Sequence, residues 1–211
     1  MEINEIRKYC LNCKLKPCSN KGCPLHNNIP EFIHEEDEKK AFYILSKTTV
    51  LPAICSRICQ SAKQCKGSCV RGIKGESVSI NEMEKYLADN AISKGYKLPK
   101  NKEDKREIET PRKKVAIIGG GPSGLTAAAF LAMENIDVTI FEKNSKLGGL
   151  LEYGIPDFRL NRNVVKNTID KIIELGITAK TNITVRKGHS NTKNNRWFWC
   201  SVHIYRSQRA K

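Results

Sequence analysis

Eight of the nine cysteines fall into two close arrays, and these are the residues of the chain best suited to chemistry. The first array has the pattern C-x2-C-x4-C-x4-C-P and the second has the pattern C-x3-C-x5-C-x3-C. Their members are Cys10, Cys13, Cys18 and Cys23, followed by Cys55, Cys59, Cys65 and Cys69. Cysteines that stay reduced in the cytosol serve as ligands or catalysts rather than as disulfides. The spacing therefore predicts a metal or iron–sulfur site.

The end of the first array favours iron–sulfur clusters. Ferredoxin-type runs finish in Cys-Pro, and that last cysteine ligates the other cluster of a pair. Cys23-Pro24 fits this habit, so we expect the two arrays to exchange ligands. Structural zinc is the alternative, but it prefers paired C-x2-C knuckles, and only Cys10 and Cys13 form one. Buried cysteines without any ligand are a third interpretation, which hydrophilic neighbours such as Asn12 and Lys66 disfavour.

A second site is predicted at the sequence GGGPSG. Gly119, Gly121 and Gly124 would allow a tight turn, a close approach of the backbone to a pyrophosphate, and close packing of helix on strand. The N-terminus of the following helix would face the phosphates. Glu142 ends the next strand and is placed to bind an unphosphorylated adenosine ribose, as in FAD or NAD. A structural turn without a ligand is the alternative.

The segment after Glu142 adds two features to this site. The Gly148-Gly149 pair predicts a second close approach of the backbone to the ligand. Arg159 is a candidate contact to a phosphate or the flavin, although a single arginine is more often a solvated surface residue.

Two scaffolds must position these sites. The first part of the chain predicts a helical module, with helices at 31–45, 54–64 and 80–93. A charged stretch with two prolines and no apolar period predicts a linker over 98–113.

From Val115 onward the pattern predicts a β-α-β start. We expect strands at Val115–Ile118 and in DVTIFEK, a helix at Leu125–Glu134, a helix that stops at Gly176, and a further strand at TNITVRK. The predicted fold class is α+β overall, with an N-terminal all-α Fe–S domain followed by an incomplete α/β Rossmann-like FAD-binding domain.

Composition restricts the possible partners less than the motifs do. The 211 residues carry a formal net charge of +15, which raises nucleic acid as a candidate, but acidic residues are interleaved with lysines over most of the chain. No apolar run is long enough to cross a bilayer, and the N-terminus MEINEIRKYC does not read as a signal peptide. We expect a cytoplasmic protein with no nucleic-acid and no membrane partner.

Taken together, the motifs resemble those of a known family. This family is the small (beta) subunit of bacterial NADPH-dependent glutamate synthase, to which the N-terminal half of dihydropyrimidine dehydrogenase is similar. The resemblance runs from about Cys10 to Lys187. It rests on CLNCKLKPCSNKGCPLHNNIPEFI, CSRICQSAKQCKGSCVRGIKGESVSINEME, VAIIGGGPSG and FEKNSKLGGLLEYGIPDFRL.

The resemblance implies two [4Fe-4S] clusters and an FAD. One cluster would be held by Cys10, Cys13, Cys18 and Cys69, and the other by Cys23, Cys59, Cys65 and Glu84. Cys55 is left over and competes with Glu84 as the last ligand. The implied FAD contacts are Gly119, Gly120, Gly121, Pro122, Ser123, Gly124, Glu142, Lys143, Gly148, Gly149, Leu150 and Arg159, with Val185 as a weaker backbone candidate.

The resemblance also implies an oxidoreductase. In such proteins NADPH gives a hydride to FAD, and single electrons then pass through the clusters to a large catalytic subunit or another acceptor. NADPH would bind to a second Rossmann unit of the full-length protein, for which these 211 residues show no motif.

The resemblance stops near Lys187-Gly188, where we predict a frameshift. The tail 188–211 holds both tryptophans and the ninth cysteine, but it has no leucine, acidic residue or apolar period. Because Trp is encoded only by TGG, reading one base later turns Trp197-Phe198 and Trp199-Cys200 each into a glycine codon. The shifted tail then reads DIAILKIIDGFGAVFISTGAKEP, close to the family segment AVFIATGA. A real basic tail that binds nucleic acid or membrane is the alternative.

The expected domains are thus 1–97 for two clusters, a linker at 98–113, a partial FAD domain at 114–187 and an aberrant tail at 188–211. Without the third strand of the FAD unit, we expect poorly covered apolar faces at Val115–Ile118 and Val138–Phe141, weak FAD binding and no NADPH oxidation. Two other functions stay open: a zinc module whose basic tail binds nucleic acid, and a non-catalytic fragment that docks on a partner.

Overall fold

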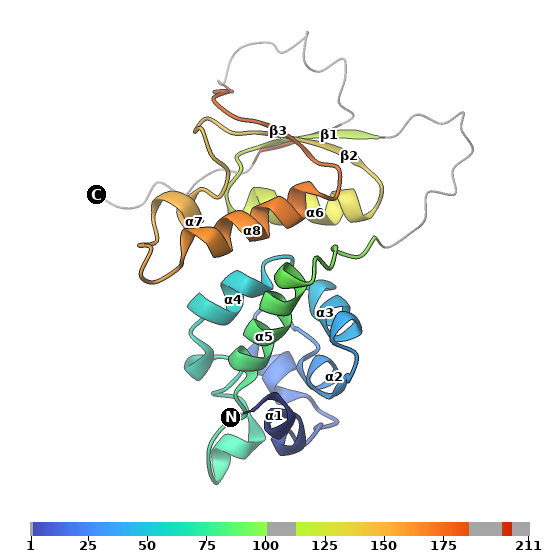
Figure 1. The fold of residues 1–211 in the computed structure, drawn as a ribbon, viewed down its shortest axis with the longest axis vertical. Coiled ribbons are helices and arrows are strands. Elements are labelled where there is room, and N and C mark those ends of the chain that lie inside the picture. Colours follow the sequence, from blue (N-terminus) through green and yellow to red (C-terminus); the bar gives the residue numbers. More distant parts are fainter. Residues whose placement is uncertain (1, 101–112, 186–199, 204–211) are drawn as a thin grey trace, which may run out of the picture. The chain divides into compact units, whose positions relative to one another are not determined.

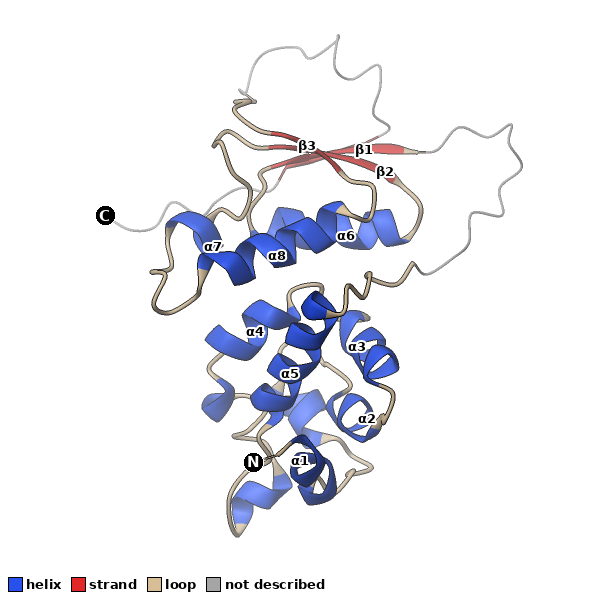
Figure 2. Ribbon diagram, viewed as in Figure 1, coloured by secondary structure: helices blue, strands red, loops and turns tan. Residues whose placement is uncertain are grey.

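The computed structural model describes residues 2–100, 113–185 and 200–203. The chain forms two compact units, Met1–Leu98 and Pro99–Lys211 (Figure 1). In the first unit every regular element described is a helix, whereas the second unit combines helices with a parallel sheet (Figure 2). The general layout expected from the sequence, a helical module followed by an α/β unit, is therefore found.

The first unit is built from five α-helices and three short turns of helix in the cysteine loops. The α-helices are α1 (Ile3–Tyr9), α2 (Ile29–His34), α3 (Glu38–Ser46), α4 (Pro52–Ile58) and α5 (Ile80–Ser93). The short turns are η1 (Cys18–Gly22), η2 (Ser61–Lys63) and η3 (Val70–Ile73). Helix α5 has the predicted bounds because its apolar period is regular and long.

The predictions for the other helices of this unit were partly wrong. The single helix expected at 31–45 is divided into α2 and α3, because the Asp37 carboxylate accepts hydrogen bonds from the backbone N–H groups of Lys39 and Lys40 and so begins a new helix. The helix expected at 54–64 ends at Ile58, since Cys59 adopts an extended backbone. The second cysteine array therefore lies largely in irregular backbone.

An apolar core positions the cysteine loops of the first unit. Ile6, Phe32, Leu45 and Met83 are among its fully buried members, and they come from four different helices. The partly buried cysteines packed against this core are Cys10, Cys18, Cys23, Cys65 and Cys69. Burial of the helix faces thus fixes the loops in which most of the predicted ligands lie.

Helices α3 and α5 are also joined by one acidic side chain. Glu38 accepts hydrogen bonds from the Lys94 ammonium and the Tyr86 hydroxyl. These two donors, Lys94 first, hold the pKa of Glu38 below its ordinary value of 4.5.

We expect Glu38→Gln to lower the free energy of unfolding at pH 7 by about 0.5–1 kcal/mol, the range for partly exposed ion pairs. Because the folded-state pKa is depressed, this contribution is present above about pH 4.5 and is lost as the pH falls through the folded-state pKa. Urea unfolding at pH 7 and pH 3 measures it, with Glu36→Gln as the control for loss of a nearby exposed acid. An equal deficit at both pH values would contradict the prediction.

The second unit is a parallel sheet with helices against it. Its strands are β1 (Lys114–Ile118), β2 (Asp137–Phe141), β3 (Thr178–Lys180) and β4 (Cys200–His203), in the order β3-β2-β1-β4. All three pairings are parallel. Helices α6 (Pro122–Met133), α7 (Leu150–Tyr153) and α8 (Arg162–Ile173) lie on one side of the sheet (Figure 1). This strand order is that of the first half of a doubly wound nucleotide-binding fold.

Two expectations for this unit are corrected. The last strand lies at Thr178–Lys180, just before TNITVRK, and its side chains are exposed. Ile183 still donates a backbone hydrogen bond to the carbonyl of Glu142, so the chain continues beside β2. The apolar strands are not poorly covered: Ile117 and Ile140 are completely buried. Moreover, β4 of the predicted aberrant tail pairs with β1 from Val115 to Ile118.

Some expectations fall outside the part of the chain that the structure describes. These are most of the linker, residues 101–112, the proposed frameshift at 187–188 and the tail except 200–203. Among the described residues, none of the helices combines the length and the apolar character that crossing a bilayer requires.

Candidate functional site

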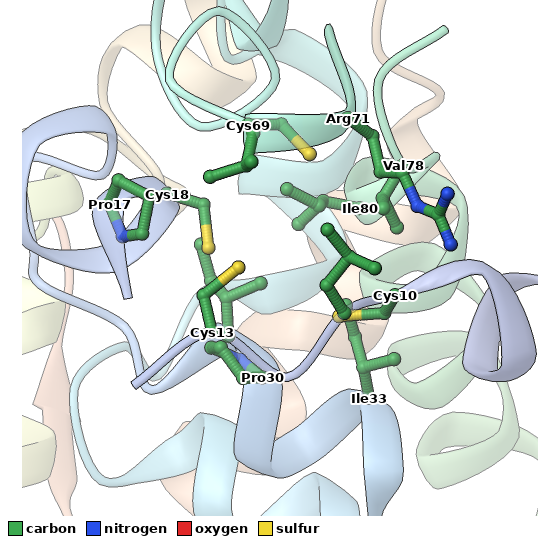
Figure 3. Close-up of a pocket in the computed structure, with 13 residues that line it drawn as sticks. Cys10, Cys13, Pro17, Cys18, Pro30, Ile33, Cys69, Arg71, Val78 and Ile80 are labelled. Atoms are coloured by element: carbon green, nitrogen blue, oxygen red, sulfur yellow. The ribbon is translucent and has the colours of Figure 1, made fainter. Parts of the chain in front are cut away.

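Four cysteines from the two arrays line one pocket in the first unit. Three of them come from the first array and the fourth from the second: Cys10, Cys13, Cys18 and Cys69 (Figure 3). The remaining lining is mainly apolar and includes Ile29, Ile33, Val78 and Ile80. The pocket contains about 350 Å³ of empty space, part of it open to solvent. The first of the two ligand sets implied by the family resemblance is thus gathered around a single space.

The backbone of the first array is wound tightly around this pocket. Cys18 begins the π-helical turn η1, and its carbonyl accepts a hydrogen bond from Cys23 at 2.8 Å. The buried hydroxyl of Ser19 accepts a hydrogen bond from the N–H of Ile29 at 3.1 Å, which ties the turn to the start of α2. Cys18 and Cys23 are therefore held at opposite ends of one compact turn.

The electrostatics of the pocket favour neutral thiols in the absence of a metal. Burial raises the pKa of Cys10 and of Cys18 above the ordinary value of 9.0. The positive charge of Arg71 acts in the opposite direction on Cys10. Thiolates, which are the metal-binding form, would thus be stabilised chiefly by the metal or cluster that they bind.

The remaining predicted ligands form a second group on α4, α5 and the adjacent loops. The backbone of the two arrays meets here, because a Cβ placed on Gly22 would lie 2.7 Å from the Cα of Cys65. Cys23, which follows Gly22, and Cys65 are close enough for their charges to interact. Glu84 on α5 interacts in the same way with Cys59 and Cys65.

Glu84 is the most telling member of this group. Glu84 is 8% exposed, and its Oε1 atom is buried without a hydrogen-bond partner among the residues that the structure describes. Burial, followed by the nearby Cys59 charge, raises the pKa of Glu84 to about 8. A buried carboxylate without a partner is costly, and a metal ligand is a common explanation for such a group. This observation fits the assignment of Glu84 as the non-cysteine ligand.

Cys55 lies in the same group. Its position therefore leaves both Cys55 and Glu84 as candidates for the last ligand of the second cluster. Cys55 and Cys59 influence each other: the neighbouring Cys55 lowers the pKa of Cys59 to about 7, and the neighbouring Cys59, together with burial, raises the pKa of Cys55. Its Sγ atom is also 3.8 Å from the Thr49 hydroxyl. Cys55 thus has the Thr49 hydroxyl beside it, whereas the Glu84 Oε1 atom has no hydrogen-bond partner in the described part of the chain.

A four-iron cluster and a single zinc ion place different demands on these side chains. Within the described ranges, no three His, Cys, Asp or Glu side chains converge closely enough to bind one metal ion. Tetrahedral zinc would need four ligands within about 2.3 Å of one point. A cubane of four iron and four sulfide atoms is much larger, and it needs cysteines that surround a space. The pocket of Figure 3 offers this arrangement.

The glycine loop of the second unit has the geometry expected for a dinucleotide. Gly119 has φ +105°, which allows the turn from β1 into α6. A Cβ on Gly124 would lie 1.9 Å from the carbonyl oxygen of Gly119, so only glycine permits this packing of helix on strand. A Cβ on Gly121 would meet nothing closer than Gly149 at 4.0 Å. Space is therefore left at the N-terminus of α6, where a phosphate would lie.

Glu142 organises this loop from the end of β2. It is 5% exposed, and its carboxylate accepts hydrogen bonds from the backbone N–H groups of Gly120 at 2.7 Å and Asn144 at 2.9 Å. Each carboxylate oxygen has a second lone pair, so Glu142 keeps acceptor capacity for two ribose hydroxyls.

The Gly148-Gly149 pair, predicted to approach the ligand, lies directly against the glycine loop. Gly148 donates a backbone hydrogen bond to the carbonyl of Gly120 at 2.7 Å. Gly149 has φ +52°, and a Cβ there would lie 2.8 Å from the Cα of Gly121. The two loops therefore meet directly beside the N-terminus of α6.

The remaining predicted FAD contacts lie mainly at the surface of the second unit. Arg159 and Leu150 are exposed, as are Ser123 and Lys143, whereas Pro122 and Val185 are half-buried. In the same segment as Arg159, Arg162 has defined partners, and the sequence did not single it out. It donates hydrogen bonds to the carbonyls of Leu151 at 2.7 Å and Ile155 at 2.8 Å. Arg162 thus holds the α7 turn, and no local sequence signal identified it.

Comparison with protein families agrees with this division. Residues 2–96 match the family described as dihydropyrimidine dehydrogenase domain II, 4Fe-4S cluster. Residues 117–164 match a family described as an NAD(P)-binding Rossmann-like domain.

Whole-chain relatives point the same way. The chain is 34% identical over 179 residues to the NADPH glutamate synthase small chain of Escherichia coli (strain K12), an alignment that covers 83% of this chain and 37% of that protein. It is 33% identical over 190 residues to the corresponding small chain of Bacillus subtilis (strain 168), covering 83% and 36%. It is also 34% identical over 190 residues to the NADH glutamate synthase of Schizosaccharomyces pombe, covering 88% and 9%. The chain therefore spans little more than a third of the length of the small chains that it matches.

Proposed function

We propose that this chain, which is similar over 83% of its length to NADPH glutamate synthase small chains, is the iron–sulfur and flavin-binding part of an electron-transferring oxidoreductase of that family. We propose two [4Fe-4S] clusters in residues 1–97 and an FAD in residues 114–187. The observation that carries the proposal is the convergence of Cys10, Cys13, Cys18 and Cys69 around one pocket.

The second cluster is supported by a different observation. Cys23, Cys59 and Cys65 lie near Glu84, whose buried Oε1 atom has no partner in the described part of the protein. We propose these four side chains as the second ligand set. Each set then draws on both arrays, as in two-cluster ferredoxins, where a cysteine of one run serves the other cluster.

FAD is proposed at the glycine loop because three features of the loop suit an adenine dinucleotide with an unphosphorylated ribose. Gly121 leaves space at the N-terminus of α6, the Gly148-Gly149 turn closes beside it, and Glu142 keeps acceptor capacity. NAD(P)H at the same loop is the competing occupant, as the name of the matched Rossmann-like family indicates. Direct determination of the bound nucleotide separates the two.

The chemistry of the cofactors sets the task of the protein. A flavin exchanges two electrons with a nicotinamide and single electrons with iron–sulfur clusters. The chain itself binds and orients: Glu142 fixes the glycine loop, Arg162 fixes the α7 turn, and the apolar core holds the cysteine loops. NADPH oxidation and electron delivery to a large catalytic subunit are proposed for the whole protein, because this chain spans little more than a third of its relatives.

Anaerobic reconstitution of the 211-residue chain with iron and sulfide, followed by iron, sulfide and zinc analysis, tests the proposal. We expect about eight iron and eight sulfide per chain, as two four-iron clusters require. After incubation with FAD and removal of free nucleotide, we also expect bound flavin. Zinc without sulfide would overturn the iron–sulfur function and favour the zinc module. Iron and sulfide without flavin would restrict the proposal to the first unit.

A further inference from the structure

Arg71 joins the two segments that supply ligands to the pocket of Figure 3. Its Nε atom donates a hydrogen bond to the backbone carbonyl of Tyr9 at 2.9 Å. Its guanidinium lies over the Tyr9 ring, with the central carbon 4.4 Å from the ring centroid. The Tyr9 hydroxyl in turn donates a hydrogen bond to the carbonyl of Glu76 at 2.9 Å. Tyr9 is thus held twice by the loop that follows Cys69.

This double attachment controls the separation of two predicted ligands. Cys10 follows Tyr9 directly in the sequence, and Cys69 precedes Arg71 by two residues. The two cysteines belong to different arrays, so no local turn fixes the distance between them. The Tyr9–Arg71 contact provides the missing constraint, since it connects the residue next to one ligand with the turn of helix η3 that follows the other.

Arg71 also brings the positive charge of the pocket. Among the described residues that line the pocket, it is the only one with a cationic side chain (Figure 3). Other cations of the same loops, such as Lys74, do not line it. A fixed positive charge beside a redox centre stabilises the form that has gained an electron. Outer-shell groups of this kind also orient the ligands of metal sites and tune their properties.

We propose that Arg71 is a positioning residue for the cluster at Cys10, Cys13, Cys18 and Cys69, and that its charge raises the reduction potential of that cluster. The proposal deepens the function proposed above and rests on it, because it requires a cluster in this pocket. It assigns two separable properties to one side chain. The hydrogen bond to Tyr9 holds the ligands, and the guanidinium charge favours the reduced cluster.

Two substitutions separate these properties. Arg71→Lys keeps the charge but loses the planar group that bonds and stacks on Tyr9 at the same time. Arg71→Gln loses the charge as well. The matched control is Lys74→Gln, which removes an exposed cation from the same loop without touching the pocket. All are made in the full 211-residue chain.

The first measurement is the rate at which a chelator removes iron from the reconstituted chain. In both Arg71 variants we expect about half of the iron, that of the affected cluster, to be released about tenfold faster than in the unchanged chain. Tenfold is the lower end of the effect that substitutions next to metal ligands have on metal sites. The other half should be lost at the unchanged rate. Far-UV circular dichroism of the cluster-free chains verifies that the helices of the variants are retained.

The second measurement is an EPR-monitored redox titration, which a purely structural role would not affect. In Arg71→Gln the potential of one cluster should shift to a lower value, whereas in Arg71→Lys it should stay near that of the unchanged chain. Lys74→Gln should match the unchanged chain in both measurements. Unchanged iron release and potentials in Arg71→Gln would overturn the inference. If the unchanged chain binds no cluster at all, the proposed function itself fails, and the two failures are thus distinguishable.

Discussion

A chain that carries Cys69→Ala is expected to bind about half of the iron and sulfide of the unchanged chain, because one of two four-iron clusters would lose a ligand. Cys69 is the only contribution of the second array to the pocket with Cys10, Cys13 and Cys18 among the described residues. A cluster held by three adjacent thiolates on one side would be open to solvent on the other. The remaining iron would belong to the group around Glu84.

Iron and acid-labile sulfide per chain, measured after anaerobic reconstitution, determine the outcome. Cys55→Ala is the matched control, since it removes a thiol of the same array that the proposed ligand sets do not use. We expect this control to keep both clusters. Full iron content in Cys69→Ala would contradict the assignment of the pocket. Half content in Cys55→Ala would instead show that Cys55, rather than Glu84, completes the second cluster.

The cysteine spacing predicted more of this site than the helix pattern did. A Cys-Pro ending led to the expectation that the arrays exchange ligands, and Cys69 does lie with three cysteines of the first array. Spacing is informative here because ligand-rich loops are short and their geometry is strongly restricted. The roles of Arg71 and Arg162 could not be predicted in the same way, since each depends on backbone carbonyls that only the folded chain brings within reach.

The errors in the fold have equally specific causes. The break between α2 and α3 depends on one capping carboxylate, Asp37, inside a stretch whose apolar period continues. The last strand was predicted a few residues too late in the sequence. The three residues of β3 are exposed and show no alternation of apolar and polar side chains, whereas the neighbouring TNITVRK does alternate. The pairing of β4 with β1 could not be predicted either, because long-range parallel pairing leaves no local signal in four residues.

The second prediction with a large expected effect concerns two glycines of the glycine loop. Replacing Gly121 by alanine should weaken FAD binding, whereas replacing Gly124 by alanine should destabilise the fold. Gly121→Ala should leave the fold intact, since its Cβ would meet nothing closer than 4.0 Å and Gly121 has φ −77°, which any residue adopts. The added methyl group would instead occupy the space that a pyrophosphate needs. An overlap that costs about 1–3 kcal/mol corresponds to FAD binding that is about five- to 150-fold weaker.

Gly124→Ala should destabilise the second unit instead. Its Cβ would lie 1.9 Å from the carbonyl oxygen of Gly119, and neither α6 nor β1 can move away without losing packing. We expect a loss of about 3 kcal/mol or more, at the upper end of the range for overpacked sites. Thermal unfolding followed by circular dichroism measures this loss, and equilibrium dialysis measures FAD affinity.

The pair of variants distinguishes a binding loop from a structural turn. If the loop binds a dinucleotide, Gly121→Ala loses FAD affinity while its free energy of unfolding changes by no more than about 0.5 kcal/mol, as for a neutral substitution. If the loop is only a tight turn between β1 and α6, Gly121→Ala changes neither property, and Gly124→Ala changes stability alone. Iron content should be unaffected in both variants, because the proposed cluster ligands belong to the other unit. Unaltered FAD affinity in Gly121→Ala would therefore count against a flavin at this loop without weakening the case for the clusters.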